Sequence, residues 1–276
     1  MKLIQRFLTN NPCYQANLRR ADSRYGTFQD RGPQGLMLHS VGCAQPKASV
    51  FVNGWNKPSY DKACVHAFID ANSGAVYQTL PWHYRGWHCG GSGNNTHVGV
   101  ELCESGAIRY TGANSFEITN RKTALADAKR SYDAAVELFA FLCGQYGLDP
   151  LSAICSHKEG CAAGIASNHG DPEHYWSGLG VGYTMNGFRA EVKAKLDAAP
   201  APTEPAPQPP TAPEPDGGKL PFPDVDPNDW YAAALRWAVE QRIVQPSAAP
   251  FRPEAPLTKA AAVVWLRRLY HAFCER

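Results

Sequence analysis

The sequence predicts an α/β domain, with a central mixed β-sheet flanked by helices, followed by a linker and a small helical module. Short apolar segments with strand character are followed by one long amphipathic helix in residues 1–197. Residues 198–218 are rich in proline and alanine, and in residues 219–276 apolar positions recur at helical spacing. These observations divide the chain of 276 residues into two folded parts and a spacer.

Five segments of the first domain have the pattern of strands. Two of them, on either side of the turn sequence NSG, predict a hairpin. In HVGVELC the valines and Leu102 lie on one face and Glu101 on the other. The five segments are GLMLHS (35–40), ACVHAFID (63–70), AVYQTL (75–80), HVGVELC (97–103) and SAICSH (152–157).

The segment 122–147 predicts a long amphipathic helix. Leu125, Ala128 and Tyr132 recur at intervals of three or four residues, which places them on one face. Gly147 stops the helix. Strands and a helix of this kind predict one sheet with helices packed on it.

Charge and hydropathy narrow the choice of partners. The formal net charge is +2, and no stripe of Lys and Arg accompanies it, so we expect no nucleic acid. No apolar run approaches the roughly 18 residues of a membrane span. The first twenty residues lack the apolar region of a secretory signal, so we expect synthesis in the cytoplasm.

The nine cysteines predict no disulfide framework. Their number is odd, they are scattered, and no close CxxC pair is present. Cys64, Cys103 and Cys143 lie in apolar segments that suit buried thiols. A zinc–thiolate site is the alternative, and Cys161 is its best candidate.

Residues that can bind a metal lie at the ends of predicted strands. His39 and His157 each end a strand, and Glu101 lies near the end of another. Strand ends can converge at one sheet edge from distant parts of the chain. Two imidazoles and one carboxylate are a common ligand set for catalytic Zn²⁺, although each residue alone is more often an ordinary surface residue.

Three blocks resemble the zinc-dependent N-acetylmuramoyl-L-alanine amidases related to phage T7 lysozyme, AmpD and peptidoglycan recognition proteins. They are GLMLHSVG (35–42), WHCGGSGNNTHVGVELCE (87–104) and SHKEGCAAGIASNHGDPEHYW (156–176), in the family's order. FLTNNPCYQA (7–16) also resembles the start of prophage endolysins. The resemblance covers residues 1–197 and implies the amidase fold and a Zn²⁺ cofactor.

The resemblance assigns roles residue by residue. His39, His157 and Asp171 match the zinc ligands, and Glu101 matches the acid that works on the zinc-bound water. His169 matches the position of a residue that stabilises the oxyanion. His169 is the strongest rival to Asp171 as ligand, and Glu104 is the second candidate for the base.

Four further residues are candidates for binding substrate. Trp87, His88 and Asn95 belong to the second block, and Trp176 ends the third. The tryptophans could stack on sugar rings, but simple core packing is an equal alternative for each. His88 could also act behind a metal ligand.

The end of the chain resembles a single S-layer-homology repeat, in FPDV, WAVEQRIV and FRPEAPLTKAAA. Such repeats bind cell-wall polymers, so the resemblance implies a secondary cell-wall polymer as a partner of residues 219–276. The linker 198–218 carries eight prolines between Pro200 and Pro215 and predicts a semi-rigid spacer.

The resemblance implies hydrolysis of the amide bond between N-acetylmuramic acid and L-alanine of peptidoglycan, by a phage or prophage endolysin. The enzyme would contact the glycan strand and the stem peptide, after a release that depends on a holin or on lysis. A non-catalytic peptidoglycan-binding protein is the alternative, and the complete set of ligands with Glu101 favours the enzyme. A metalloprotease is a distant third, because no HExxH is present.

Overall fold

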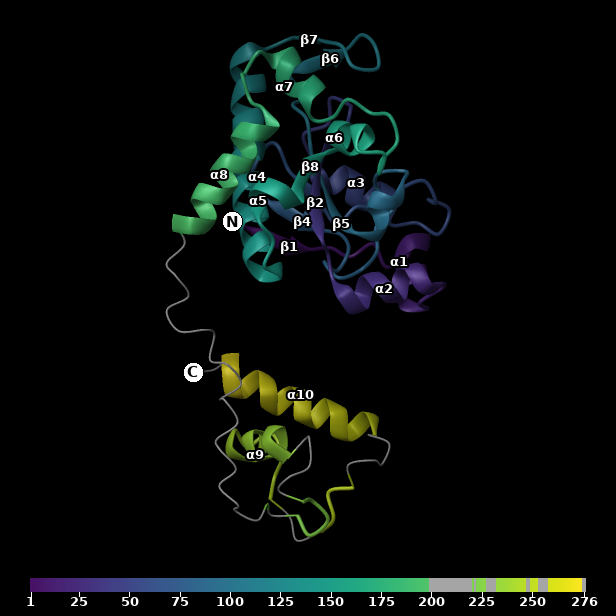
Figure 1. Cartoon of the computed structure of the whole chain (residues 1–276), viewed down its shortest axis with the longest axis vertical. Coiled ribbons are helices and arrows are strands. Elements are labelled where there is room, and N and C mark those ends of the chain that lie inside the picture. The colour runs from purple at the N-terminus through teal and green to yellow at the C-terminus, as the bar shows by residue number, and fades with distance from the viewer. Residues whose placement is uncertain (199–219, 221, 227–231, 247–248, 253–257, 275–276) are drawn as a thin grey trace. The chain divides into compact units, whose positions relative to one another are not determined.

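The structure is a computed structural model that describes residues 1–198, 220, 222–226, 232–246, 249–252 and 258–274. The chain forms two compact units, residues 1–201 and 202–276 (Figure 1). The linker predicted at 198–218 lies, beyond residue 198, outside the described residues. None of the described helices is both long enough and apolar enough to cross a membrane.

A six-stranded mixed sheet forms the centre of the first unit. The pair β3–β4 is antiparallel and is the predicted hairpin, whereas β5, β2 and β8 are mutually parallel. β2 is buried along its whole length, as expected for a central strand. The order across the sheet is β1 (Leu3–Gln5), β4 (Val76–Gln78), β3 (Ala67–Ile69), β5 (His97–Leu102), β2 (Gly35–Ser40) and β8 (Ile154–Ser156).

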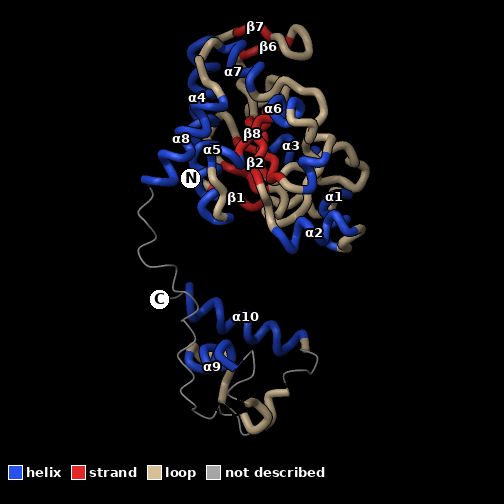
Figure 2. The backbone as a smooth tube through the Cα atoms, in the orientation of Figure 1, coloured by secondary structure: helices blue, strands red, loops and turns tan. Residues whose placement is uncertain are grey.

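Helices lie on both sides of this sheet (Figure 2). α4 (Arg121–Tyr146) packs against β3, β5 and α8 (Met185–Ala198), and α3 (Ala48–Trp55) packs against β3 and β4. The predicted α/β class, with a central mixed sheet flanked by helices, is therefore confirmed. The remaining elements of this unit are α1 (Pro12–Leu18), α2 (Ser23–Arg31), the 3-10 helix η1 (Ser92–Asn95), β6 (Ile108–Tyr110), β7 (Phe116–Ile118), α5 (Pro150–Ala153), α6 (His157–Ala162) and α7 (Glu173–Leu179).

Local sequence signals explain where α4 begins and ends. The Asn120 side chain accepts a hydrogen bond from the Thr123 N–H at 3.1 Å, which caps the first turn. Gly147 adopts a left-handed conformation with φ of 63° and ends the helix, as the sequence predicts. The buried face of α4 includes Ala128 and Tyr132, and it covers the sheet face that carries Val98 and Val100.

One predicted strand end is wrong. His157 does not end the strand but is the first residue of α6, and β8 stops at Ser156. The Ser156 side chain accepts from the Glu159 N–H, and Glu159 Oε2 accepts from the Ser156 N–H, so a capping box begins a helix here. The sequence SxxE carries this signal, which competes with the apolar pattern of the strand.

The second unit has a small core of its own around two helices, α9 (Ala232–Glu240) and α10 (Lys259–Cys274). Phe222, Leu235 and Val244 are buried in it, and Trp265 packs against it. These helices agree with the helical module that the sequence predicts for residues 219–276.

Candidate active site

The candidate site lies at the carboxyl-terminal edge of the parallel strands β5, β2 and β8. His39 on β2 pairs in register with Glu101 on β5. Leu38 pairs with Ser156 on β8, so His157 follows directly at the same edge. Parallel pairing thus brings together residues that are far apart in the sequence.

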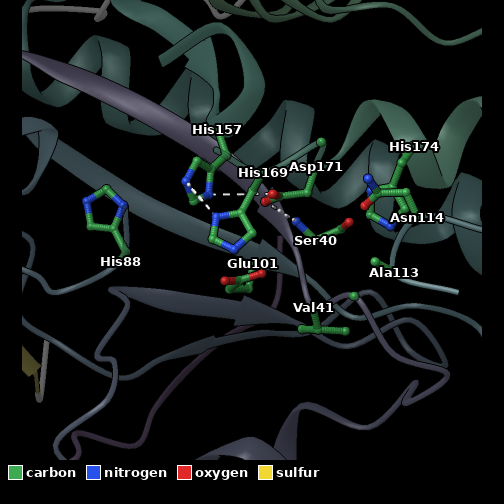
Figure 3. A pocket seen from close by; sticks show the side chains of 12 residues that line it. Ser40, Val41, His88, Glu101, Ala113, Asn114, His157, His169, Asp171 and His174 are labelled. Atoms are coloured by element: carbon green, nitrogen blue, oxygen red, sulfur yellow. Dashed lines mark hydrogen bonds and ion pairs between the residues drawn. The ribbon is translucent and has the colours of Figure 1, made fainter. Parts of the chain in front are cut away.

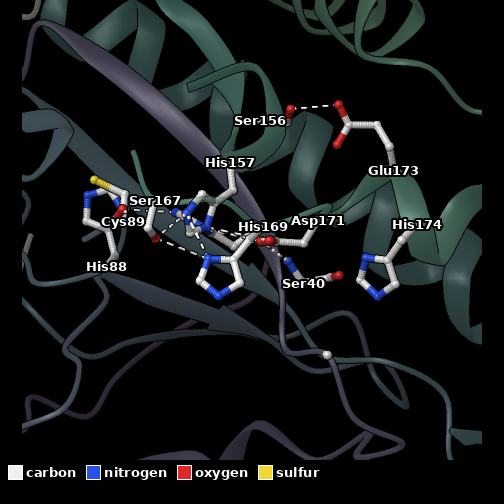
Figure 4. Close-up of polar contacts among 12 residues, drawn as sticks. Ser40, His88, Cys89, Ser156, His157, Ser167, His169, Asp171, Glu173 and His174 are labelled. Carbon is white, nitrogen blue, oxygen red and sulfur yellow. Dashed lines mark hydrogen bonds and ion pairs between the residues drawn. The ribbon is translucent and has the colours of Figure 1, made fainter. Parts of the chain in front are cut away.

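His39, His157 and Asp171 converge on one point. Each offers a ligand atom, and these atoms all lie within 4.8 Å of one another. The two Nδ1 atoms are 3.0 Å apart, and Asp171 Oδ2 lies 3.2 Å from Nδ1 of His39. The Ser40 N–H donates to Asp171 Oδ2 at 3.3 Å and fixes the carboxylate (Figure 4).

Hydrogen bonding behind His39 determines which of its nitrogens lacks a proton. His88 Nε2 lies 3.1 Å from the carbonyl of His97, which can only accept, so this nitrogen carries the proton. Burial, followed by the charges of His39 and His66, lowers the pKa of His88 well below its usual value. In neutral His88, Nδ1 therefore accepts a hydrogen bond from His39 Nε2 at 2.9 Å. Because the proton of a neutral His39 is then on Nε2, its Nδ1 carries a lone pair.

Hydrogen bonding behind His157 has the same effect. The Ser167 hydroxyl donates to the carbonyl of Cys89 at 3.1 Å, so its oxygen is left to accept. His157 Nε2 lies 3.2 Å from that oxygen and donates to it in the neutral ring. Nδ1 of His157 then also points a lone pair at the convergence point.

Three electron-pair donors facing one point fit a bound cation. Burial lowers the pKa of His39. Two neutral imidazoles and an ionised carboxylate are the donor set that Zn²⁺ accepts in proteins. Among the residues that the structure describes, Cys161 and His169 do not belong to this group.

Glu101 lies across the cleft from His157 and Asp171 (Figure 3). One of its oxygens, Oε2, is buried and has no hydrogen-bond partner within the described part of the chain. Burial, and then the charges of Asp171 and Glu104, raise the pKa of the Glu101 carboxyl well above its usual value. An unpartnered carboxyl oxygen with a raised pKa can exchange a proton with a molecule in the cleft.

The cleft has a volume of about 330 Å³. Figure 3 shows His157, His169 and Asp171 on one side of this space and Glu101 on the other. His169 is exposed, and its Nδ1 lies 3.2 Å from His157 Nε2 and 3.1 Å from the Ser167 hydroxyl. The residues that line the cleft are Ser40, Val41, Gly42, His88, Glu101, Ala113, Asn114, His157, His169, Gly170, Asp171 and His174.

The four residues predicted to bind substrate lie in different parts of the structure. Trp176 is 1% exposed and packs against Tyr132 and Phe188, so its assignment to the substrate site is corrected to the core. The sequence could not separate these alternatives, because the same residue type serves both. Of the other three, His88 lines the cleft, whereas Trp87 and Asn95 do not.

Trp87 and Asn95 stabilise the segment that carries His88. The Trp87 indole N–H lies 3.1 Å from the Tyr25 hydroxyl, to which it donates. Asn95 Oδ1 accepts from Arg85 Nε at 2.7 Å. Neither contact tests the assignment of Trp87 and Asn95 to substrate binding, which stays a prediction.

Two features of the site are missing from the sequence-based prediction. Ser167, which contacts His157, lies in the third block, but the resemblance assigns it no role. Gly99 does have a signal, because a glycine interrupts the strand pattern of β5. A Cβ at this position would lie 2.4 Å from Cγ of His88, so the His88 ring fits against β5 only because residue 99 is glycine.

Two family models match the chain. Residues 29–174 match the Amidase_2 model, described as N-acetylmuramoyl-L-alanine amidase. Residues 221–263 match the S-layer homology domain. No significant match was found among curated protein sequences.

Several solved structures are similar to the chain. The Staphylococcus aureus hydrolase AmiA, in complex with its ligand, is 19% identical, with 71% of this chain and 83% of that chain covered and a TM-score of 0.51. A mutant of PlyL is 18% identical, with coverages of 70% and 99% and a TM-score of 0.45. The PlyG catalytic domain is 19% identical, with coverages of 74% and 100% and a TM-score of 0.45. At its level of identity the likeness to AmiA supports the fold alone.

Proposed function

Because the chain belongs to the Amidase_2 family of N-acetylmuramoyl-L-alanine amidases, we propose that it uses Zn²⁺ to hydrolyse the bond between N-acetylmuramic acid and L-alanine, as a phage or prophage endolysin. The observation that carries this proposal is the arrangement of two imidazole nitrogens and a carboxylate opposite Glu101. A non-catalytic peptidoglycan-binding protein would have no use for this complete set.

His39, His157 and Asp171 would hold the ion beside the open cleft. A bound Zn²⁺ supplies a lowered pKa for a coordinated water and polarises the carbonyl of the amide. His88 and Ser167 keep the two imidazoles in the orientation and tautomer that binding requires, through the contacts behind each ring.

Glu101 would move the proton. An amide has a poor leaving group, so the departing nitrogen must be protonated as the bond breaks. Oε2 of Glu101 has no partner in the described structure, so it can accept the proton of the attacking water. The same oxygen then delivers the proton to the nitrogen of L-alanine. The products are a lactyl carboxylate on the sugar and a free amine on the stem peptide.

His169 would stabilise the negative charge that develops on the carbonyl oxygen. Its ring is exposed, lines the cleft and lies beside His157. A well-placed donor in such a position contributes roughly 3 kcal/mol to the transition state. This assignment leaves Asp171, rather than His169, as the third ligand.

The second unit would bind a polymer of the cell wall. The support is the match of residues 221–263 to the S-layer homology domain and a separate core around Phe222 and Leu235. Because the first unit is compact by itself, we expect residues 1–201 to cleave soluble fragments at the full-length rate. Co-sedimentation with purified walls should be weaker for this truncation, and equal binding would contradict the role of the second unit.

Digestion of purified cell walls tests the amidase proposal directly. We expect mass spectrometry to find glycan strands with intact lactyl groups and free peptides that begin with L-alanine. A chelator should stop the release, and added Zn²⁺ should restore it. Cleavage within the glycan or within the peptide would contradict the proposal that the bond to L-alanine is cut. Full activity after chelation would contradict the proposal that the enzyme needs Zn²⁺.

A further inference from the structure

The turn of the β6–β7 hairpin forms a further wall of the cleft. Ala113 and Asn114 lie in this turn and line the cleft. The two short strands pair antiparallel, and the turn is closed by the Thr111 N–H, which donates to the Ser115 carbonyl at 2.9 Å. The hairpin thus carries two residues to the mouth of the active site.

A buried polar cluster fixes the hairpin beside the site. The Tyr110 hydroxyl on β6 lies 2.6 Å from Glu104 Oε2 and 2.8 Å from His174 Nε2 on α7. The Gly42 N–H donates to Glu104 Oε1 at 3.2 Å. The side chain of Glu104 is 0% exposed and that of His174 is 8% exposed. Hydrogen bonds in such a buried cluster are strong, and here they join the segments after β2 and β5 to β6 and α7.

Packing of β7, the other strand of the hairpin, also holds the hairpin beside the site. The Phe116 ring on β7 lies so close to Gly178 of α7 that a Cβ there would be 2.6 Å from it. The ring also packs against Tyr175, with centroids 6.0 Å apart. Both strands of the hairpin are therefore held against α7, close to the segment that carries Asp171.

The Asn114 side chain lies beside the segment that carries Asp171. A Cβ on Gly170, the residue before Asp171, would lie 3.5 to 3.6 Å from the three end atoms of the Asn114 carboxamide. Asn114 is exposed. Within the described residues, no hydrogen bond engages its carboxamide. Its N–H and carbonyl groups are thus available to a molecule in the cleft.

We propose that Asn114 is a specificity-determining residue that binds an amide group of the substrate next to the scissile bond. A carboxamide presents a donor and an acceptor side by side, which matches an amide that offers both. Muramoyl peptides carry two such groups near the bond, namely the acetamido group of the sugar and the peptide bond after L-alanine. The inference rests on the proposed amidase function.

Steady-state kinetics of the full-length Zn²⁺-loaded chain on soluble N-acetylmuramoyl-L-alanyl-D-isoglutamine test this inference. We expect Asn114→Ala to raise KM by about tenfold with little change in kcat, because the lost hydrogen bonds are made in the ground and transition states alike. The matched control is Ser115→Ala in the same turn, which should keep the wild-type KM. The unfolding temperature of both variants should equal that of wild type, since both side chains are exposed.

Two substrate analogues identify the bound group. In one the acetamido group is replaced by a hydroxyl, and in the other an ester replaces the peptide bond after L-alanine. The effect of Asn114→Ala should vanish on one of the two analogues, and that analogue lacks the amide that Asn114 binds. Persistence of the effect on both analogues, a change in kcat alone, or an Asn114→Ala KM equal to that of Ser115→Ala would overturn the inference. A wild-type chain that releases no L-alanine amine would instead overturn the amidase proposal on which it rests.

Discussion

The two sides of the cleft are held in different ways. On one side, His39 and His157 each have one ring nitrogen fixed from behind, by His88 and by Ser167, and the other turned toward Asp171. On the other side, Glu101 has a buried carboxyl oxygen with no hydrogen-bond partner among the residues that the structure describes. Residues that bind a metal need a fixed orientation, whereas a residue that exchanges protons needs a free atom.

The largest effect should come from breaking the fixed side at Asp171. We expect Asp171→Ala to lose both stoichiometric zinc and wall lysis, because removing one of three ligands leaves too few donors. We expect His169→Ala to keep zinc and to lower kcat by about 10²- to 10³-fold, as for loss of an oxyanion donor. Elemental analysis and turnover of the two purified variants measure both quantities.

The pair of variants also decides between the rival ligands. Zinc retained by Asp171→Ala but lost by His169→Ala would exchange the two roles. Cys161→Ser serves as a control, because Cys161 lies outside the ligand group and should keep zinc and activity. Loss of zinc in that control alone would discard both assignments.

A smaller effect should follow when the support behind His39 is removed. His88→Ala leaves every proposed ligand in place but takes away the acceptor for His39 Nε2. We expect zinc affinity to fall by about 10- to 100-fold, as is usual for residues that orient a ligand. Competition with a chelator measures this affinity, and a value equal to wild type would mean that the sheet alone orients His39.

A further effect concerns the free energy of unfolding and its dependence on pH, and it lies outside the metal site. Burial raises the pKa of Glu104 from 4.5 to about 7. Between these values the folded chain binds more protons than the unfolded chain, so the contribution of Glu104 to stability is lost as the pH rises. The glutamine of Glu104→Gln does not titrate. As the pH rises, the free energy of unfolding of wild type should therefore fall relative to that of the variant, by up to about 3 kcal/mol.

Urea unfolding of wild type and Glu104→Gln, at about pH 5 and about pH 8, measures this difference. Comparing the two proteins cancels the titration of the histidines that do not contact Glu104. A difference that is the same at both pH values would contradict the raised pKa of Glu104.

The sequence predicts the strands of the site better than it predicts the contacts behind the ligands. The pattern of HVGVELC places Glu101 opposite the buried face of β5, and the structure agrees because one face of that strand packs on α4. The end of β8 was missed, since the capping box at Ser156 outweighs the apolar pattern there. Elements with a buried periodic face are therefore predictable, and their ends depend on single hydrogen bonds.

Contacts between distant segments could not be predicted from the pattern. Ser167 reaches His157 because the loop after α6 folds back against Cys89. Trp176 is buried although it lies five residues from Asp171, because α7 turns it into the core. Neither outcome leaves a periodic signal, since each depends on where a loop or short helix packs.

The central claim is that one side of the cleft binds the metal while Glu101 moves the proton. Its most direct test is to measure zinc content and turnover in a single preparation of Glu101→Gln. We expect one zinc per chain, as in wild type, with turnover on soluble muropeptide reduced by at least about 10²-fold, because the amide cannot act as a base. Turnover close to wild type, or loss of the zinc, would contradict the account.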